Sequence, residues 1–352
     1  MKQPVAHIHA IGTAVPDHDV HDAFIGWASD QLAGTREQAL FKRMADRSGI
    51  AHRYSVLPKA AGGGSPVSPG GFYAGGAMPS TAARMKVYGD AAPELALKAI
   101  DDLAEQTSLE GITHLVVASC TGFVAPGVDQ IIAARLGLSA NVERTLVGFM
   151  GCYAAVAALR VAHHIARSEP SARILVVTVE LSTLHLQPAT TIEPLLAMLQ
   201  FADGAAAALV SAEPGGISIS DFFAATLPDS DDLIRWTIGD GGFEMHLSGE
   251  VPGRIAQALA DPDLLPTRSS NSVWAVHAGG RSILDAVEHG LSLAQDALAT
   301  SRAVLNRFGN MSSATLMFVL SMLMAEDQVG DGVALAFGPG LAAEGFRFAS
   351  TV

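Results

Sequence analysis

Short hydrophobic runs alternate with segments of helical periodicity along the first half of the chain. Nearly unbroken apolar runs at residues 6–12, 114–119 and 173–181 predict buried strands. Apolar residues recur at helical spacing in residues 91–106 and 128–136, which predicts helices between the strands. Strands without polar alternation that are separated by helices predict an α/β fold with a mostly parallel sheet, covered on both faces.

The second half repeats this alternation. Residues 272–277 predict a strand that ends at His277 and runs into two glycines, and residues 332–337 predict a late strand. Helical sequence lies between the two. We therefore expect two halves, residues 1–225 and 226–352, although no internal sequence repeat demonstrates a duplication.

The region between the first two predicted strands is more polar. Residues 34–54 have a helical pattern that places Arg43 and Arg47 four positions apart, on one face. This face is either simply solvated or an entrance that attracts an anionic substrate. Residues 57–79 are rich in Gly, Pro, Ser and Ala without a sustained period, which predicts a surface loop.

Cys152 lies where the pattern predicts a strand, a turn and then a helix. Residues 145–147 are β-branched or apolar, and an alanine-rich segment continues beyond the cysteine to Arg167. Unpaired backbone N–H groups and the helix dipole favour an anion at a helix N-terminus, so a thiolate would be stabilised there. A buried cysteine that only fills space is the alternative, and this stretch alone leaves it open.

Composition narrows the classes of function. Hydrophobic residues make up 49% of the 352 positions and charged residues 16%, which is typical of a compact protein with a large core. The net charge is 22 − 35 = −13 without a long basic run, which argues against a nucleic-acid partner.

Cysteine usage and the apolar runs predict the compartment. The two cysteines, Cys120 and Cys152, are too few for a disulfide framework and have no metal-ligand spacing, so we expect a reducing environment and no metal. The N-terminal residues lack the apolar core of a signal peptide, and the longest apolar run, residues 314–325, is too short to span a bilayer. We expect a cytoplasmic protein without a membrane span.

Three stretches combine into a recognisable set: GFMGCYAA around Cys152, WAVHAGG around His277 and GNMSSA around Asn310. With the FGPG segment near the C-terminus, they resemble the type III polyketide synthases, the chalcone synthase superfamily. The segments AIGTAVP, FKRMADRS, PGVDQ, LQFADGAAA and EVPG are similar to family segments in the same order. The separations 277 − 152 = 125 and 310 − 277 = 33 are also close to the family's spacing. The resemblance implies a thiolase fold, in which two similar αβα halves form a five-layered αβαβα core.

The resemblance implies a role for each of the three residues. Cys152 would take an acyl starter from coenzyme A and hold the growing chain as a thioester. His277 and Asn310 would bind the malonyl thioester carbonyl and stabilise the enolate formed on decarboxylation.

The same chemistry explains why a histidine would accompany the thiol. A free thiol with a pKa near 8.5 is only about 3% ionised at pH 7, and lowering that pKa by roughly 2 units requires about 2.7 kcal/mol. A helix N-terminus supplies about 0.3–1 kcal/mol. We expect a protonated His277 to supply the rest.

The resemblance also places residues around the substrate. Phe201 matches an aromatic gatekeeper, and the second gatekeeper, aromatic in chalcone synthase, is Met245 here. Methionine is flexible and narrower, which disfavours a bulky phenylpropanoid starter and suits an aliphatic chain. Cys120 and His185 match cavity positions that are usually threonine in plant members. Cys120 lacks a helix N-terminus and is expected to shape the cavity rather than to act as a second nucleophile. The remaining predicted substrate-binding residues are Ser312, Gly338, Pro339 and Gly340.

A coenzyme A site follows from the same comparison. Arg43 and Arg47 match positions that carry cations for the coenzyme A phosphates, while a third position, often lysine, is Leu40 here. Ser282 matches a residue whose backbone contacts coenzyme A. The resemblance further implies a homodimer, in which Ala125 matches a position that reaches the partner's cavity.

We therefore predict an acyltransferase that loads an acyl-CoA starter, preferably a medium or long fatty acyl group, on Cys152. It would extend the starter with malonyl-CoA by decarboxylative Claisen condensation and cyclise the product to an alkylpyrone, an alkylresorcinol or a related phenolic. Coenzyme A thioesters would be substrates, and no separate cofactor is expected.

Three alternatives remain. One is a malonyl-CoA-primed synthase of the tetrahydroxynaphthalene type. Another is an initiating β-ketoacyl carrier-protein synthase, which usually has Gln-Ala-Asn after its histidine, where this chain has Ala278-Gly279-Gly280. The third is a non-catalytic protein built on the same fold.

Overall fold

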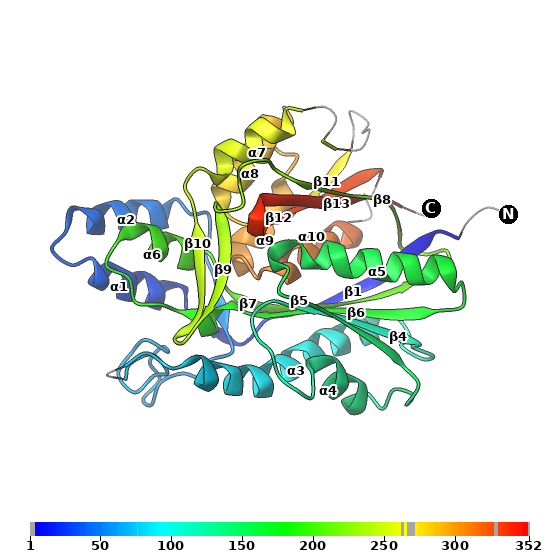
Figure 1. The fold of residues 1–352 in the computed structure, drawn as a ribbon, viewed down its shortest axis with the longest axis horizontal. Coiled ribbons are helices and arrows are strands. Elements are labelled where there is room, and N and C mark those ends of the chain that lie inside the picture. The colour runs from blue at the N-terminus through cyan, green and yellow to red at the C-terminus, as the bar shows by residue number, and fades with distance from the viewer. Residues whose placement is uncertain (1–3, 76, 262–263, 266–271, 327–329, 351–352) are drawn as a thin grey trace.

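The chain forms five stacked layers, seen edge-on in the computed structural model of Figure 1. The structure describes residues 4–350 except 76, 262–263, 266–271 and 327–329. Helices α3 and α4 cover one outer face, α7 and α8 the other, and α5 and α10 lie between two groups of strands. This arrangement confirms the predicted α/β fold with an αβαβα core.

Nine strands form the central sheet. In chain order they are β1 (Ala6–Ala14), β4 (His114–Ser119), β5 (Glu143–Gly148), β6 (Arg173–Leu181), β7 (Asp203–Ser211), β8 (Ile217–Thr226), β11 (Val273–Val276), β12 (Gly332–Gly338) and β13 (Ala342–Ser350). Two small ladders stand apart from it, β2 (His18–Asp19) with β3 (Tyr54–Ser55), and β9 (Ile234–Gly239) with β10 (Gly242–Leu247).

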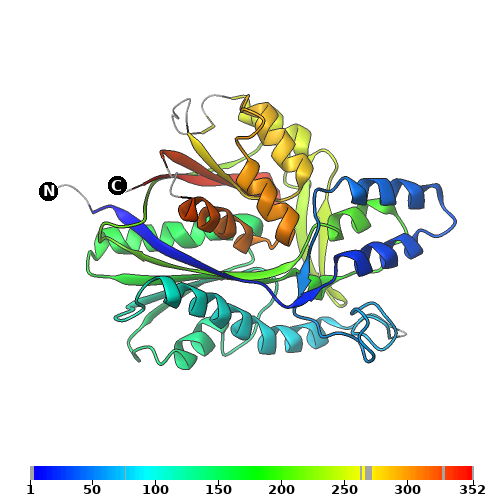
Figure 2. The same cartoon turned by 180° about the vertical axis from the view of Figure 1, so that it is seen from behind.

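The helices are α1 (His21–Gln31), α2 (Arg36–Asp46), α3 (Thr81–Gln106), α4 (Val128–Arg135), α5 (Ala154–Ser168), α6 (Ile192–Met198), α7 (Val251–Leu259), α8 (Arg281–Gly290), α9 (Ala299–Phe308) and α10 (Ser313–Ala325). Three 3₁₀ turns are η1 (Gly151–Tyr153), η2 (Ser182–His185) and η3 (Pro339–Leu341). From behind, α1, α2 and α6 form a lobe beside the layers (Figure 2).

The strand pairing repeats between the two halves. The sheet order is β11-β12-β13-β8-β1-β7-β6-β4-β5. In the first half β4 is parallel to β6, β6 antiparallel to β7, and β7 antiparallel to β1. In the second half β11 is parallel to β12, β12 antiparallel to β13, and β13 antiparallel to β8. The structure thus shows a repeat of topology that the sequence does not reveal.

The expectation of a mostly parallel sheet is wrong. Of the eight pairings between the nine strands, three are parallel and five antiparallel. A continuous apolar run shows that a strand is buried on both faces, but it carries no information about strand direction. β7 and β13, which close the two repeats, account for four of the antiparallel pairings.

The halves meet at a short ladder between β1 and β8, where residues 6–8 pair with residues 217–219. β8 belongs by its pairing to the second half. We propose to place the division in residues 212–216, because the expected boundary after residue 225 would separate β8 from its partner strand.

The helices follow from their sequences. α10 is apolar nearly all round, which is typical of a helix buried on every side, and it packs between the layers. α3 buries one face against β1, β6 and β7. It lies so close to β1 that a Cβ on Gly12 would stand 2.2 Å from Leu103 N. α3 begins at Thr81, ten residues before the predicted start, with the Ser80 side chain accepting a hydrogen bond from Ala83 N.

The described residues of the predicted loop, residues 57–79, contain no helix or strand. Among the described residues, no helix is both long and apolar enough to cross a membrane.

Candidate active site

Cys152, His277 and Asn310 line one cavity of about 60 Å³ between the two halves. Cys152 lies in η1 just ahead of α5, His277 directly follows β11, and Asn310 stands three residues before α10. The repeat explains their convergence, because α5 and α10 are the equivalent central helices of the two halves. The three residues predicted to act together are therefore adjacent to one cavity.

Glycines allow the backbone around Cys152 to turn sharply. Gly151 has φ = 74°, and a Cβ there would stand 2.2 Å from Pro339 Cδ. A Cβ on Gly338 would lie 3.3 Å from Cys152 N and closer still to the Tyr153 ring. The GFMGC and FGPG segments thus pack against each other without intervening side chains, which holds the thiol at the cavity wall.

Hydrogen bonds fix Asn310 from both sides. Its backbone N–H donates to Gln200 O at 2.8 Å, and its carbonyl accepts from Ala202 N at 2.9 Å. The side-chain amide donates from Nδ2 to Gly279 O at 3.1 Å, while Oδ1 accepts from Ser312 N at 2.9 Å. The amide therefore has a fixed orientation, with Nδ2 toward the loop that follows His277.

His277 is buried, with only 1% of its surface exposed. Neither imidazole nitrogen has a hydrogen-bond partner among the described residues, and both are inaccessible to solvent. Burial lowers the pKa of His277 to about 3. Unpartnered buried nitrogens are rare in native proteins and are typical of sites where a substrate supplies the missing partner.

Burial also opposes ionisation of Cys152. It raises the pKa of the thiol to about 12, although hydrogen bonds with Ser312 and Asn310 act in the opposite direction. For each group taken alone, the neutral form is therefore preferred. A buried thiolate and a buried imidazolium would have to form together, so that each charge offsets the burial cost of the other. The helix N-terminus that the sequence suggested does not offset this burial, and the activation of Cys152 by a protonated His277 stays a prediction.

Glu180 is a buried carboxyl group beside this cavity that sequence analysis did not identify. It is the last residue but one of the apolar strand β6, and it accepts hydrogen bonds from Cys120 N at 2.9 Å, Thr121 Oγ1 at 3.0 Å and Ser313 Oγ. Burial raises its pKa to about 7. A lone glutamate inside the run RILVVTVEL was the available signal, because an acidic residue is almost never fully buried without partners.

Cys120 occupies the position in the first half that His277 occupies in the second, directly after the equivalent strand. Its Sγ accepts a hydrogen bond from Gly151 N at 3.0 Å. Burial and the nearby Glu180 carboxyl raise its pKa well above the usual value. These contacts support the predicted cavity-shaping role and oppose a role as second nucleophile.

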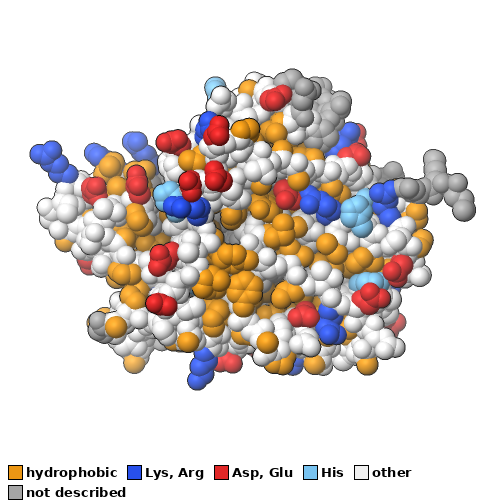
Figure 3. Space-filling view, in the orientation of Figure 1, with side chains coloured by type: hydrophobic (Ala, Val, Ile, Leu, Met, Phe, Trp, Pro, Cys, Tyr) orange, Lys and Arg blue, Asp and Glu red, His pale blue; other side chains and the backbone are white. Residues whose placement is uncertain are grey.

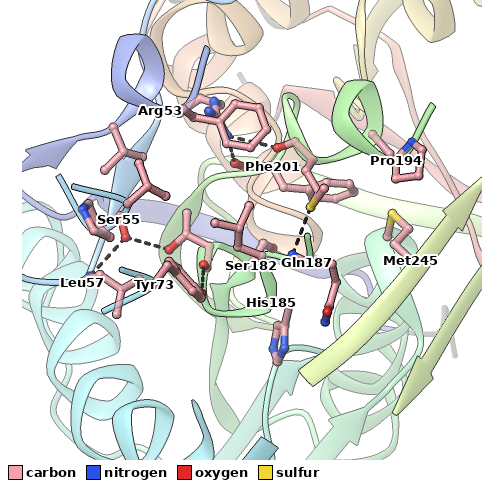
Figure 4. A pocket seen from close by; sticks show the side chains of 18 of the residues that line it. Arg53, Ser55, Leu57, Tyr73, Ser182, His185, Gln187, Pro194, Phe201 and Met245 are labelled. Carbon is pink, nitrogen blue, oxygen red and sulfur yellow. Dashed lines mark hydrogen bonds between the residues drawn. The ribbon is translucent and has the colours of Figure 1, made fainter. Parts of the chain in front are cut away.

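A larger cavity of about 390 Å³ adjoins the first (Figure 4). Both cavities are lined by Ser182, Phe201, Trp236 and Met245, so these four side chains form the partition. Phe201 and Met245 thus lie where gatekeepers were predicted. Trp236 gave no signal in the sequence; its Nε1 donates to Cys120 O at 3.1 Å.

His185 lines the larger cavity but is held as a neutral residue. Its Nδ1 accepts from Phe243 N at 3.0 Å, and its Nε2 bonds Thr121 O at 2.7 Å, which requires the proton on Nε2. The ring stacks on Phe243 with centroids 4.2 Å apart. Burial lowers its pKa to about 4. Because both nitrogens are engaged, His185 can offer a substrate only its ring surface.

The predicted coenzyme A residues lie at an exposed rim. Arg43 is exposed on α2, Arg47 is exposed directly after the last residue of that helix, and Ser282 is exposed at the start of α8. The Arg281 guanidinium donates to Arg47 O at 3.2 Å, which joins the two helices. Gly279 and Ile283, on either side of this rim, line the smaller cavity. Arg281 and Ser282 thus follow His277 after only three intervening residues, 278–280.

Of the remaining predicted substrate-binding residues, Ser312, Gly338 and Pro339 line the smaller cavity. Gly340, with φ = 70°, lies in η3 directly after them. Among the described residues, no three His, Cys, Asp or Glu side chains are placed to share a metal ion.

Comparisons with known proteins cover nearly the whole chain. The family model for the N-terminal domain of chalcone and stilbene synthases matches residues 1–214, and the model for the C-terminal domain matches residues 219–351. A curated relative, the α-pyrone synthesis polyketide synthase-like Pks18 of Mycobacterium tuberculosis, is 36% identical over 251 residues. That match spans 66% of this chain and 64% of the relative, which is less than two thirds of its length.

Two solved structures superpose over almost their full length. PKS-I from the brown alga Ectocarpus siliculosus has a TM-score of 0.89 and 29% identity, with 99% of each chain covered. The C-terminal type III polyketide synthase domain of Steely1, a type I/III hybrid from Dictyostelium, has a TM-score of 0.86 and 25% identity, covering 99% of this chain and 100% of that one.

Proposed function

This chain belongs to the chalcone and stilbene synthase family, the type III polyketide synthases, and we propose that it extends an acyl starter held on Cys152 with malonyl units. The observation that carries the proposal is the cavity shared by Cys152, His277 and Asn310, in which the imidazole lacks any partner among the described residues. A thioester carbonyl entering this cavity would provide that partner.

In the loading step, the Cys152 sulfur attacks the carbonyl of an acyl-CoA and the thiol proton passes to His277. Coenzyme A leaves as its thiol and takes up that proton. The acyl group then remains on Cys152 as a thioester.

In the extension step, malonyl-CoA loses CO₂, and the electron pair of the broken C–C bond forms an enolate of acetyl-CoA. His277 and Asn310 donate hydrogen bonds to the enolate oxygen. The enolate carbon attacks the carbonyl of the Cys152 thioester, which forms the new C–C bond and breaks the C–S bond. Cys152 leaves as its thiolate, and the extended β-ketoacyl chain is then carried by coenzyme A. The mostly apolar lining of the cavity would strengthen these hydrogen bonds, because few other protein dipoles compete for the oxygen.

For the starter, we propose a medium or long fatty acyl group. The larger cavity, at about 390 Å³, falls in the size range of small-molecule pockets and is lined mostly by apolar side chains. Three of its hydroxyl-bearing residues, Ser55, Thr183 and Tyr73, already bond one another: Ser55 Oγ and Thr183 Oγ1 lie 2.7 Å apart, and Tyr73 OH donates to Thr183 O at 2.6 Å. These three hydroxyl groups would therefore keep their hydrogen-bond partners when an alkyl chain fills the cavity.

Cyclisation to an α-pyrone is the product we propose, by analogy with the printed description of the mycobacterial relative. An alkylresorcinol is the alternative. The two differ in whether an oxygen or a carbon of the chain closes the ring.

Mass spectrometry of the intact protein tests the proposal. The protein is incubated with acyl-CoAs from acetyl to stearoyl, with and without malonyl-CoA, and adducts and products are measured together. A long acyl adduct on Cys152 followed by pyrone release supports the full proposal. Product from malonyl-CoA alone would instead favour the malonyl-primed type, and no adduct from any thioester would contradict the proposed reaction.

We also propose a homodimer built on the β5 edge. β5 is the last strand of the sheet, and residues 143–146 on it are exposed. Hydrophobic side chains gather over β5 and β9 in the middle of the face in Figure 3, and they include Phe123, Leu146, Phe149 and Ile238. An exposed edge strand beside an apolar patch is a surface that a second copy could cover. Ala125, exposed beside Phe123, would then face the partner subunit.

A further inference from the structure

The outer face of α2 combines cations with exposed apolar side chains. At about 100° per residue, Arg36, Leu40, Arg43, Met44 and Arg47 fall within an arc of about 100° on one side of this helix. No acidic residue lies in that arc. Phe41 and Ala45 are buried on the other side, against the protein.

The arginines of this face are available to a partner. Among the described residues, none of Arg36, Arg43 and Arg47 forms an ion pair. Glu37, the nearest acid beside the arc, accepts a hydrogen bond from Ile192 N at 3.0 Å and so is engaged with α6. On a chain of net charge −13, this α2 face is a local positive surface.

The apolar pair needs a separate explanation. Leu40 and Met44 are 39% and 43% exposed. The other large hydrophobic residues with comparable exposure in the described chain are Val5 near the N-terminus and four residues of the apolar patch at the β5 edge: Phe123, Leu146, Phe149 and Ile238. Coenzyme A phosphates would use the arginines but gain nothing from an exposed leucine and methionine. A protein surface with acidic residues around an apolar centre would use both.

The position of α2 beside α8 indicates which kind of protein would bind to the α2 face. Arg281 Nη1 donates to Arg47 O at 3.2 Å, which joins the end of α2 to the start of α8, and Ile283 on α8 lines the catalytic cavity. A partner seated on α2 would therefore stand beside α8, the helix that contributes Ile283 to the wall of the catalytic cavity. A partner there is useful to the reaction if it carries its own thioester on a flexible arm.

We propose that the α2 face docks an acidic acyl carrier protein, which presents the starter as a phosphopantetheine thioester to Cys152. The inference rests on the proposed function. It adds that the starter is received from a protein as well as from coenzyme A, and that Leu40 and Met44 contact the carrier. Coenzyme A and the carrier protein present the acyl group on the same phosphopantetheine arm. The arm of either donor would therefore enter beside Arg43, Arg47 and Ser282.

The test compares two donors of one acyl group, decanoyl-CoA and decanoyl loaded on a recombinant bacterial fatty-acid acyl carrier protein. The rate of Cys152 acylation is measured by intact-protein mass spectrometry for the wild type and for Leu40→Asn/Met44→Asn. These substitutions remove the apolar contact without changing charge, so steering of coenzyme A phosphates is unaffected. Val5→Asn is the matched control, because it removes an equally exposed apolar side chain elsewhere.

The double variant should lose about tenfold or more in kcat/KM for the carrier-bound donor and less than twofold for decanoyl-CoA. Val5→Asn should change neither value. An equal effect on both donors, or no effect on either, would overturn the inference, as would a wild type that accepts only decanoyl-CoA. If neither donor acylates Cys152, the proposed function itself fails, so the two failures are distinguishable.

Discussion

Replacing His277 with glutamine tests whether the imidazole makes Cys152 reactive. Glutamine has a comparable length but cannot take the thiol proton. The readout is the rate of alkylation of Cys152 by iodoacetamide between pH 5 and pH 10, because only the thiolate reacts at an appreciable rate.

The expected magnitude follows from burial. Without a neighbouring cation, burial raises the pKa of Cys152 to about 12. Relative to a free thiol with a pKa near 8.5, this corresponds to about 5 kcal/mol against the thiolate. Such a thiol is ionised to about one part in 10⁵ at pH 7, against about 3% for a free thiol with a pKa near 8.5. In the proposed mechanism, proton transfer to His277 in the wild type would form an ion pair in which each charge offsets the burial of the other.

The variant should therefore react at least about 100-fold more slowly than the wild type at pH 7. Its rate should still rise about tenfold per pH unit up to pH 10, because its thiol remains below its pKa. The wild type should level off at lower pH. Peptide mapping separates Cys152 from Cys120, whose pKa burial raises well above the usual value.

His185→Gln provides the matched control. His185 is also a buried histidine near the cavities, but its nitrogens bond Phe243 N and Thr121 O rather than facing Cys152. Its replacement should leave the pH profile of Cys152 alkylation in place. Superimposable profiles for the wild type and His277→Gln would refute the pairing of thiol and imidazole.

Three other variants probe the remaining parts of the proposal. Cys152→Ala should abolish chain extension yet still decarboxylate malonyl-CoA, because His277 and Asn310 remain. Release of ¹⁴CO₂ measures the decarboxylation. Polyketide formed by this variant would disprove the assignment of Cys152 as the nucleophile. Met245→Trp should narrow the partition between the cavities and lower kcat/KM for stearoyl-CoA at least tenfold relative to hexanoyl-CoA; an unchanged ratio would show that the chain takes another path. Leu146→Asp should place a charge in the exposed apolar patch at the β5 edge and convert dimers to monomers, as measured by light scattering after gel filtration. Val5→Asp, the control, should leave the dimer intact. A wild type that is already monomeric would refute the homodimer.

The sequence predicts the elements around the site well because the relevant signals are local. The apolar runs of β4 and β6 match the observed strands at both ends. Gly151, directly before Cys152, and Gly279 and Gly280, shortly after His277, mark the turns that follow strands. Strand direction was predicted wrongly, because burial on both faces looks the same for parallel and antiparallel neighbours. Trp236 and His185 were beyond local reasoning, since their roles depend on contacts with Cys120, Thr121 and Phe243, at sequence separations of 58 or more.

The repeated topology explains why this chemistry arises where the two halves meet. In each half, one position follows the strand β4 or β11, and another precedes the central helix α5 or α10. The first half has Cys120 and Cys152 at these positions, and the second has His277 and Asn310. A nucleophile must lie opposite the groups that stabilise developing charge, so a symmetric pair of identical residues could not serve both tasks. The fold brings two pairs of equivalent positions toward one cavity. Because the side chains of each pair differ, one half supplies the nucleophile and the other half supplies the groups that stabilise developing charge. Exchanging Cys152 and Asn310 in one double variant, Cys152→Asn/Asn310→Cys, should therefore fail to restore extension, because the thiol would then lie on the same half as His277 and the amide would face it from the wrong side.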